Sequence, residues 1–388
     1  MNSYIPPRPS VDAIGDAPKG THLTRVHLLI KAITETIGKS SWSFMTFHLP
    51  NIRYLSNFSG SSAVVVISVV DATEVRLTLI TDRRYLSQAS GELAELIAST
   101  DIDAAVIDQG VGSLTQMAGK AARGSETIVA EFAHITHGTF LELINGTAPQ
   151  STISDATLAI EGLRTIKDPH EIALIAQAAT IADAAYRETV QRLTSPITEL
   201  EFAARLNLQM MMLGAGGPSF DTIVASGANS AMPHAKPTNR VIERGDIVVV
   251  DFGAEYRGYR SDCTRTVVAG GEAGSKRFQS AYDAVARAQT AGIDAISAGN
   301  EVAAIDLACR SALEPALRTR FNHGTGHGVG LDIHELPWVS ERSELTQGAN
   351  MVITVEPGIY FDGEFGIRIE DTLLITETGS RSLTALPK

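Results

Sequence analysis

Residues 246–266 read DIVVVDFGAEYRGYRSDCTRT, an apolar strand that ends at Asp251, a turn, and a second strand that starts after Asp262. The β-branched residues favour an extended chain, and the Arg-Gly pair is typical of a hairpin turn. With the turn centred near Tyr256 and Arg257, the two aspartates are expected to face each other on adjacent strands. Two like charges in that position repel each other, so the arrangement costs stability unless a cation lies between them.

A second strand pair carries two further acidic residues. Glu356 follows the apolar run MVITV, and Glu370 lies within the sequence GIRIED. Period-two alternation places Ile367 and Ile369 on one face of the strand and Arg368 with Glu370 on the other. This pair therefore repeats the pattern of acidic residues on one face of adjacent strands.

Four histidines lie in loops of the same half of the chain. Residues 322–335, NHGTGHGVGLDIHE, contain His323, His327 and His334 among four glycines, and a proline-framed loop holds His234. Each signal alone has an ordinary explanation, because strand-end aspartates usually face solvent and histidines in glycine-rich loops usually form hydrogen bonds. Their combination, in this order and spacing, indicates a catalytic or metal site.

The chemistry of such a cluster suits a pair of metal ions. Four carboxylates and one imidazole would balance two divalent cations, and mostly oxygen ligands favour manganese, cobalt or iron over a thiolate-type zinc site. Bridging carboxylates hold two metals roughly 3.5–4 Å apart in dinuclear hydrolases. A hydroxide held between the ions is then the expected nucleophile.

The chain should form two domains after an arm over residues 1–21. Residues 22–165 alternate strands and helices, which predicts an α/β domain, with strands at 43–47, 63–70, 76–81, 104–107 and 127–130 and a helix at 85–97. Asp168, Pro169 and Glu171 form a capping-box-like helix start for an α+β domain over residues 166–388. The helix that starts there is expected to run to about Leu193. Further helices are expected at 198–214, 279–297 and 301–317, and strands at 247–250, 264–268, 351–355 and 365–375.

Composition limits the partners and the compartment. The 388 residues carry a net charge of −12, which disfavours nucleic acid and anionic membranes as partners. Only two cysteines occur, so no disulfide framework is expected. The chain starts without an apolar core of signal-peptide length and has no run of ~20 apolar residues. A cytoplasmic location is therefore expected.

Several segments resemble the signature sequences of the pita-bread metallopeptidases, which include Xaa-Pro aminopeptidases, prolidases and methionine aminopeptidases. They are VVVDFGAEYRGYRSDCTRT, HGTGHGVGLDIHE, VITVEPGIY and GIRIEDT. The resemblance covers roughly residues 168–388. NIRYLSNFSGSSAVVVIS and LTLITDRRY are similar to the N-terminal domain of the Xaa-Pro branch, which methionine aminopeptidases generally lack. The resemblance implies an α/β creatinase-like N-terminal domain followed by an α+β pita-bread catalytic domain.

The resemblance also implies a role for each residue of the cluster. The metal ligands would be Asp251, Asp262, His327, Glu356 and Glu370, with Asp262 and Glu370 bridging two divalent ions. His234 and His334 would contact the substrate carbonyl, and Glu356 would relay a proton to the leaving nitrogen. His323 would line the substrate pocket, and Arg368 would steady the acidic ligands.

The implied activity is metal-dependent hydrolysis of the bond before proline in peptides, by a homodimer or a higher homo-oligomer. Manganese is the favoured ion, with cobalt, iron or zinc as alternatives. A dipeptidase rather than an aminopeptidase is one alternative, and the sequence assigns no group that would grip a free substrate carboxylate. An ectoine-type or creatinase-like small-molecule hydrolase or lyase on the same fold is another. A non-catalytic binding protein is disfavoured because no expected ligand residue is missing.

Overall fold

The computed structural model describes residues 14–71, 74–147, 151–271 and 274–388, which divide into two units. The first unit spans Asp16–Arg164, and the second comprises Thr165–Lys388 together with Ile14 and Gly15. Most of the arm expected over residues 1–21 lies outside the described residues, and the first helix begins at Thr21.

The first unit is built on one six-stranded mixed sheet. Its strand order is β4-β3-β2-β1-β5-β6, in which β2 is antiparallel to both neighbours and the outer pairs are parallel. The strands are β1 (Trp42–Thr46), β2 (Ala63–Val69), β3 (Val75–Thr81), β4 (Asp103–Asp108), β5 (Thr127–Ala130) and β6 (Thr152–Asp155). The first five are close to the predicted strands, whereas the half-exposed β6 was not predicted.

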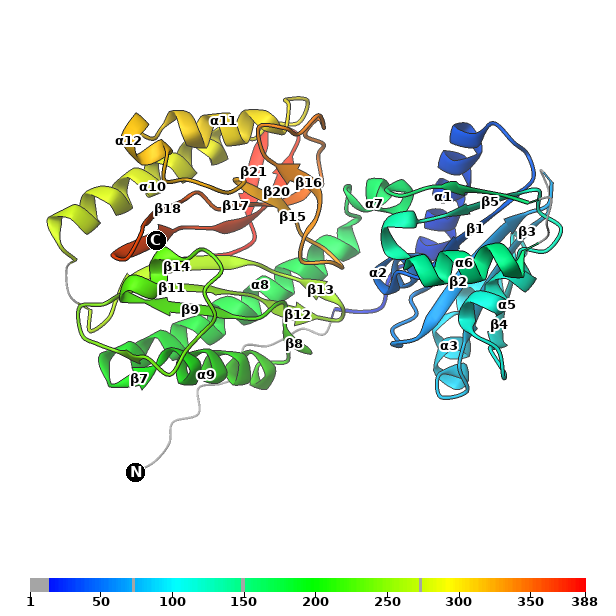
Figure 1. The fold of residues 1–388 in the computed structure, drawn as a ribbon, viewed down its shortest axis with the longest axis horizontal. Helices are drawn as coiled ribbons and strands as arrows, with labels where there is room; N and C mark the ends of the chain where they lie inside the picture. The colour runs from blue at the N-terminus through cyan, green and yellow to red at the C-terminus, as the bar shows by residue number, and fades with distance from the viewer. Residues whose placement is uncertain (1–13, 72–73, 148–150, 272–273) are drawn as a thin grey trace. The chain divides into compact units, whose positions relative to one another are not determined.

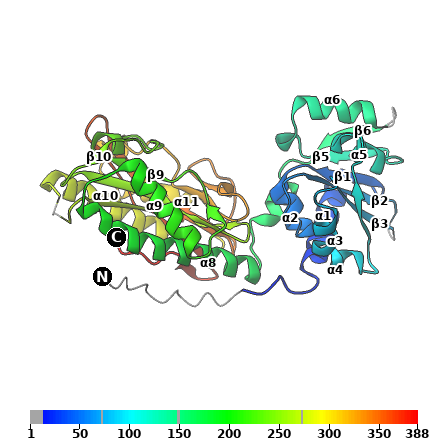
Figure 2. The same ribbon diagram turned by 90° about the horizontal axis from the view of Figure 1, so that it is seen from below.

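Helices cover the sheet of the first unit (Figures 1 and 2). They are α1 (Thr21–Ile37), α2 (Leu49–Ser56), α3 (Leu86–Glu92), α4 (Ala94–Ile97), α5 (Leu114–Ala121), α6 (His137–Gly146), α7 (Ala159–Arg164) and the short 3₁₀ helix η1 (Phe132–His134). The single helix predicted over residues 85–97 is therefore two helices, which meet at Leu93.

The second unit starts with the predicted capping box. Asp168 accepts hydrogen bonds from the backbone of His170 and Glu171, and the Glu171 side chain accepts from the Asp168 backbone. Such a cap is worth about 1 kcal/mol. The helices are α8 (Pro169–Thr189), η2 (Val190–Thr194), α9 (Glu199–Met212), η3 (Gly227–Ala231), α10 (Lys276–Asp294), α11 (Ala303–Ser311) and α12 (Pro315–Arg318). The helix predicted over residues 301–317 is two helices, because Pro315 starts a new helix instead of continuing one.

The strands of the second unit pair antiparallel in several small sheets. The sheet orders are β14-β11-β9, β13-β12-β8, β10-β7, β16-β15-β17-β20-β21 and β18-β19. The strands are β7 (Ile197–Thr198), β8 (Gly217–Pro218), β9 (Ile223–Ser226), β10 (Val241–Ile242), β11 (Ile247–Phe252), β12 (Ala254–Tyr256), β13 (Tyr259–Arg260), β14 (Cys263–Val268), β15 (Gly326–Gly328), β16 (Glu335–Val339), β17 (Val352–Val355), β18 (Gly358–Phe361), β19 (Phe365–Arg368), β20 (Asp371–Thr376) and β21 (Gly379–Ser382). Helices α8 and α9 lie beside β9, β11 and β12, and α10 and α11 lie beside β16 and β17 (Figure 1).

The hairpin that carries the two aspartates differs from the prediction by one residue. Its turn is centred between Arg257 and Gly258, because Tyr256 pairs with Tyr259. Asp251 therefore lies opposite Thr264, and not opposite Asp262 as expected. Moving the turn by one residue moves the cross-strand partner by two positions, so Asp262 still projects from the same face of the sheet as Thr264.

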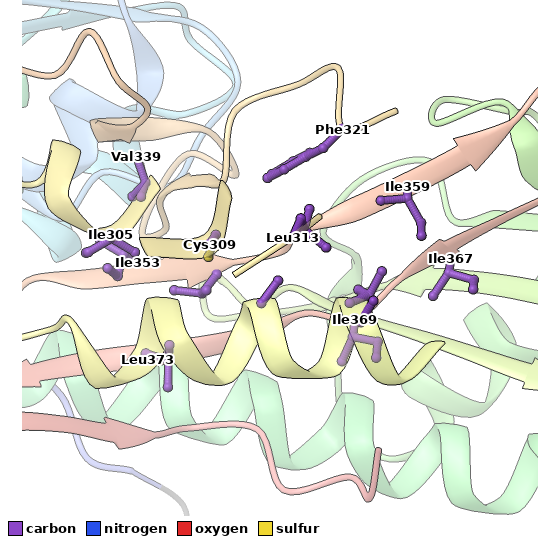
Figure 3. Close-up of a cluster of buried hydrophobic side chains, with 14 of the residues drawn as sticks. Ile305, Cys309, Leu313, Phe321, Val339, Ile353, Ile359, Ile367, Ile369 and Leu373 are labelled. Carbon is purple, nitrogen blue, oxygen red and sulfur yellow. The ribbon is translucent and has the colours of Figure 1, made fainter. Parts of the chain in front are cut away.

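A buried apolar cluster lies behind the second strand pair. Figure 3 shows Ile305 and Cys309 of α11 close to Ile353 of β17, and Ile367 and Ile369 in the same cluster. Burying an isoleucine side chain contributes roughly 1.5–3 kcal/mol. The alternation predicted for this strand is confirmed, since its two isoleucines pack in this core. Among the described residues, no helix combines the length and the hydrophobicity that crossing a membrane requires.

Candidate metal centre

All five residues that the sequence suggests as metal ligands line one cavity of the second unit, which has a volume of about 310 Å³. Antiparallel pairing brings them together from strand ends and strand junctions that are up to 119 residues apart. Asp251 lies near the end of β11, Asp262 precedes β14, His327 is in β15, Glu356 follows β17, and Glu370 lies between β19 and β20.

The distances in this cluster suit coordination. His327 Nε2 lies 3.6 Å from Asp262 Oδ2 and 3.4 Å from Glu356 Oε1. The potential ligand atoms of Asp262, His327 and Glu370 all lie within 4.8 Å of one another. His327 Nδ1 donates to the carbonyl of Gly328 at 3.0 Å, so the lone pair on Nε2 is directed at the carboxylates.

The electrostatics of the cavity also favour a cation. Oδ1 of Asp251, Oδ1 of Asp262 and Oε1 of Glu370 are buried and have no hydrogen-bond partner within the described part of the chain. Burial, and then repulsion by neighbouring carboxylates, raises the pKa of Asp262 and of Glu370 well above the ordinary range. Burial also raises the pKa of Glu356 to about 8. Divalent ions would offset these charges, so the residues present fit a metal centre.

Arg368 is held in place beside the acidic cluster. Its guanidinium donates to Asp251 Oδ2 at 2.7 Å, to the Tyr360 hydroxyl at 2.8 Å and to the Pro233 carbonyl at 3.2 Å. Asp251, Tyr360 and other neighbours keep the pKa of Arg368 above its ordinary value although burial opposes this. The guanidinium therefore stays charged and contacts Asp251, one of the expected ligands.

The three histidines expected to contact the substrate line the same cavity. His234 and His334 are exposed, and the His334 ring meets the edge of the His327 ring with centroids 4.4 Å apart. His323 is more enclosed, and its Nε2 lies 3.1 Å from the Tyr360 hydroxyl. Every residue proposed from the sequence thus lies in one place.

Sequence reasoning missed two threonines that hold the acidic side chains. Thr264 donates to Glu370 Oε2 at 2.6 Å, and Thr354 donates to Glu356 Oε1 at 3.3 Å. Thr264 lies two positions after Asp262, and Thr354 lies two positions before Glu356. The same period-two rule that identified the face of Arg368 and Glu370 could have found both threonines.

Sequence reasoning also missed the apolar wall of the cavity and Tyr360. Phe220, Ile223, Pro233 and Trp338 line the cavity, and Trp338 is 50% exposed. Phe220 and Pro233 lie in loops, Ile223 begins β9 and Trp338 lies in β16, so no single periodic pattern in the sequence marks them. Their position next to the acidic cluster provides an apolar surface for a substrate ring.

Comparison with known proteins agrees with this geometry. Residues 173–377 match the metallopeptidase family M24, and residues 31–166 match the creatinase/prolidase N-terminal domain. The uncharacterized peptidase YqhT of Bacillus subtilis is 37% identical over 346 residues, which cover 87% of this chain and 92% of YqhT.

Two solved structures are similar over almost the whole chain. A Xaa-Pro dipeptidase from Bacillus anthracis has a TM-score of 0.85 at 33% identity, with 95% of this chain and 98% of that chain covered. An X-Pro aminopeptidase from Thermotoga maritima has a TM-score of 0.78 at 33% identity, with 92% and 98% covered. The expected fold, a creatinase-like α/β domain followed by a metallopeptidase domain of α+β type, is confirmed.

Proposed function

The chain belongs to metallopeptidase family M24, and from this we propose that it hydrolyses the bond between an N-terminal residue and a following proline. The observation that carries the proposal is the convergence of four carboxylates and His327 on one cavity with an apolar wall. The related structures named for Xaa-Pro dipeptidase and X-Pro aminopeptidase activity support the substrate class.

The proposed ligands of two divalent ions are Asp251, Asp262, His327, Glu356 and Glu370. Four carboxylates and a single imidazole favour manganese, with cobalt, iron or zinc as alternatives. Such ions would supply Lewis acidity and activate water for attack on the carbonyl carbon. Asp262 and Glu370 each offer a ligand atom within 4.8 Å of the other and of His327, which suits a bridging position.

The protein side chains would orient the peptide and move protons. The bond before proline is a tertiary amide without N–H, so recognition must use the carbonyl oxygen and the ring. His234 and His334 can donate hydrogen bonds to that oxygen as negative charge develops on it. Glu356 can take a proton from water and pass it to the leaving proline nitrogen. The proline ring would pack against Phe220 and Ile223.

The cavity favours peptides longer than a dipeptide. A dipeptidase needs a cation for the free carboxylate of its substrate, and Arg368 is the one lysine or arginine among the described residues of this cavity. Asp251, Tyr360 and the Pro233 carbonyl already accept hydrogen bonds from that guanidinium, and the exposed Trp338 lines the cavity without a charge. We therefore propose an aminopeptidase, with the dipeptidase as the alternative.

We propose that residues 22–165 and 166–388 are the functional domains, that the protein acts in the cytoplasm, and that it assembles as a homodimer or a higher homo-oligomer. Proline-containing peptides are the proposed partners.

The test compares turnover of a Xaa-Pro dipeptide, a Xaa-Pro-Yaa tripeptide and a proline-free tripeptide by the protein loaded with Mn²⁺, with the metal counted per chain. The proposal expects two metal ions per chain and turnover of the proline tripeptide above both other substrates. Equal turnover of the proline-free peptide contradicts proline specificity. Faster turnover of the dipeptide assigns the alternative activity.

A further inference from the structure

A second histidine and carboxylate cluster lies in the first unit, far along the chain from the acidic cavity. His48 is the N-cap residue of α2, His134 ends η1, and Glu161 lies in α7. Helices α2 and α7 are in contact in this unit. The fold thus brings together three side chains that are separated by 86 and 27 residues in the sequence, and nothing in the proposed peptidase chemistry uses them.

The geometry of the cluster is compact. The imidazoles of His48 and His134 stack face to face, with centroids 3.8 Å apart and planes 3° from parallel. His134 Nε2 lies 2.6 Å from Glu161 Oε1. One potential ligand atom from each of the three residues lies within 4.8 Å of the others. A neutral imidazole carries a nitrogen lone pair that can bind a cation.

One carboxylate oxygen of Glu161 has hydrogen-bond partners among the described residues, and the other has none. Asn51 Nδ2 donates to Glu161 Oε1 at 2.9 Å and to Glu131 Oε1 at 2.7 Å, which places two carboxylates around one amide. Glu161 is only 8% exposed, and its second oxygen, Oε2, is buried without a hydrogen-bond partner among the described residues. A buried carboxylate oxygen of this kind costs free energy unless a cation or a donor reaches it.

A positive charge would also relieve a repulsion within the cluster. The carboxylate of Glu131 shares the Asn51 amide with Glu161 and so places a second acidic group beside the cluster. Asn51 Oδ1 accepts from Arg164 at 2.7 Å, which orients the amide so that its donors face the two carboxylates. The cluster therefore presents a fixed carboxylate beside two imidazoles that are only partly buried, so an ion can enter from solvent.

We propose that His48, His134 and Glu161 form a binding site for a zinc-like divalent cation in the N-terminal unit. Two imidazoles and one carboxylate are a ligand set that suits Zn²⁺, with a fourth position open to water. Because Zn–N and Zn–O bonds are about 2.0–2.2 Å long, binding requires the two rings to rotate out of their stack until their nitrogens converge. Asn51 would hold the ligating carboxylate in place.

A bound ion would cross-link parts of the first unit. The ion would join the start of α2, the end of η1 and α7, so it would fasten three segments of the first unit. It would differ from the acidic cavity in chemistry, because two of its three ligands are nitrogen atoms whereas four of the five in the cavity are carboxylates. The two sites can therefore be studied separately.

The test uses the full chain with the acidic cavity disabled by Asp262→Asn and Glu370→Gln, freed of metal with a chelator. Co²⁺ is then titrated while absorption between about 500 and 650 nm is followed, where nitrogen-ligated tetrahedral Co²⁺ absorbs, and Zn²⁺ is added as competitor. Further variants on this background are His134→Ala, His48→Gln and, as a matched control, His137→Ala. His137 is an exposed histidine three residues from His134.

The proposal expects one Co²⁺ per chain, displaced by Zn²⁺, and a Zn²⁺-dependent rise in the melting temperature. His134→Ala and His48→Gln should each abolish the absorption and the rise, whereas His137→Ala should retain both. The proposal is overturned if the background protein binds no Co²⁺, which would mean that His134 and Glu161 form only a hydrogen-bonded pair. It is also overturned if both histidine variants bind Co²⁺ as the background does. Binding of Co²⁺ by the background protein is measured without any variant of the cluster. The test therefore stays decisive even if one of the histidine variants misfolds.

Discussion

At the scale of single residues, the buried carboxylates of the acidic cavity are costly to ionise without a counterion. Asp262 is 5% exposed, one of its oxygens has no hydrogen-bond partner among the described residues, and its other oxygen lies 3.6 Å from His327 Nε2. The cost of burying such a carboxylate is several kcal/mol when it is unpaired. The residue therefore makes sense as a ligand and poorly as a structural ion pair.

Asp262→Asn should abolish turnover and lower the metal content, because it removes a charge and one ligand atom while the shape is kept. We expect kcat to fall by at least about 10³-fold, a loss typical of an essential charged group. Metal per chain by elemental analysis and turnover of a Xaa-Pro-Yaa tripeptide are the readouts. Asp362→Asn, an exposed aspartate in the turn between β18 and β19, should change neither. Normal metal content in Asp262→Asn would remove this residue from the ligand set.

Trp338 offers a test of the preferred peptide length. Trp338→Arg places a cation on the exposed lining of the cavity, where it can bond the free carboxylate of a dipeptide. A hydrogen bond to a charged group is worth about 1.5–3 kcal/mol, so kcat/KM for the dipeptide relative to the tripeptide should rise about tenfold or more. The neutral Trp338→Gln is the matched control and should leave the ratio near that of the parent. An unchanged ratio in Trp338→Arg would show that substrate carboxylates do not reach this position.

At the scale of elements, the positions of the proposed ligands depend on how closely neighbouring strands approach one another. A Cβ added at Gly253, which joins β11 to β12, would collide with the carbonyl of Ser261 and with the Ser219 hydroxyl. Because Ser261 directly precedes Asp262, a shift of that backbone moves a proposed ligand. A glycine outside the cluster is therefore part of its construction.

Gly253→Ala should weaken metal binding although it touches no ligand. Overpacking of this kind costs about 1–3 kcal/mol, and part of that cost should appear as a displaced Asp262. The measurements are the metal affinity and the midpoint of urea unfolding. Gly217→Ala, in the neighbouring β8, has open space for the new methyl group and should match the parent in both. If both variants bind metal equally well, the strand approach does not position the ligand.

The sequence was informative where a short-range rule decides the structure. The cap at Asp168 and the alternation from Ile367 to Glu370 were predicted, since each depends on neighbours within a few residues. The predicted cross-strand partner of Asp251 was wrong by two positions. Arg257 and Gly258 both adopt the left-handed backbone conformation, which centres the turn one residue later than expected. Trp338, which lines the cavity, and Tyr360, which contacts Arg368 and His323, were missed because only tertiary packing brings them to these positions.

At the scale of the whole molecule, metal binding and folding of the second unit should be linked. The acidic residues of the cavity lie in or next to strands from β11 to β20 of this unit, so the charge state of the cavity affects all of these strands. Burial keeps the pKa of Glu356 at about 8, and burial with repulsion holds those of Asp262 and Glu370 well above their ordinary values. Ordinary carboxyl pKa values near 4 apply once the chain unfolds.

This difference fixes the sign of a pH effect on the chelated protein. Carboxyls whose pKa is raised by folding stabilise the fold fully below the unfolded pKa, and that contribution is lost as pH rises through the folded pKa, here through about 8 for Glu356. Bound cations remove the penalty, because they favour the ionised form. The difference in melting temperature between the metal-loaded and the chelated protein should therefore widen from pH 6 to pH 9. The Asp262→Asn variant, measured in parallel, should show a much smaller difference at both pH values. A gap that stays constant or narrows with pH would mean that the buried carboxyls are not the groups through which metal stabilises the fold.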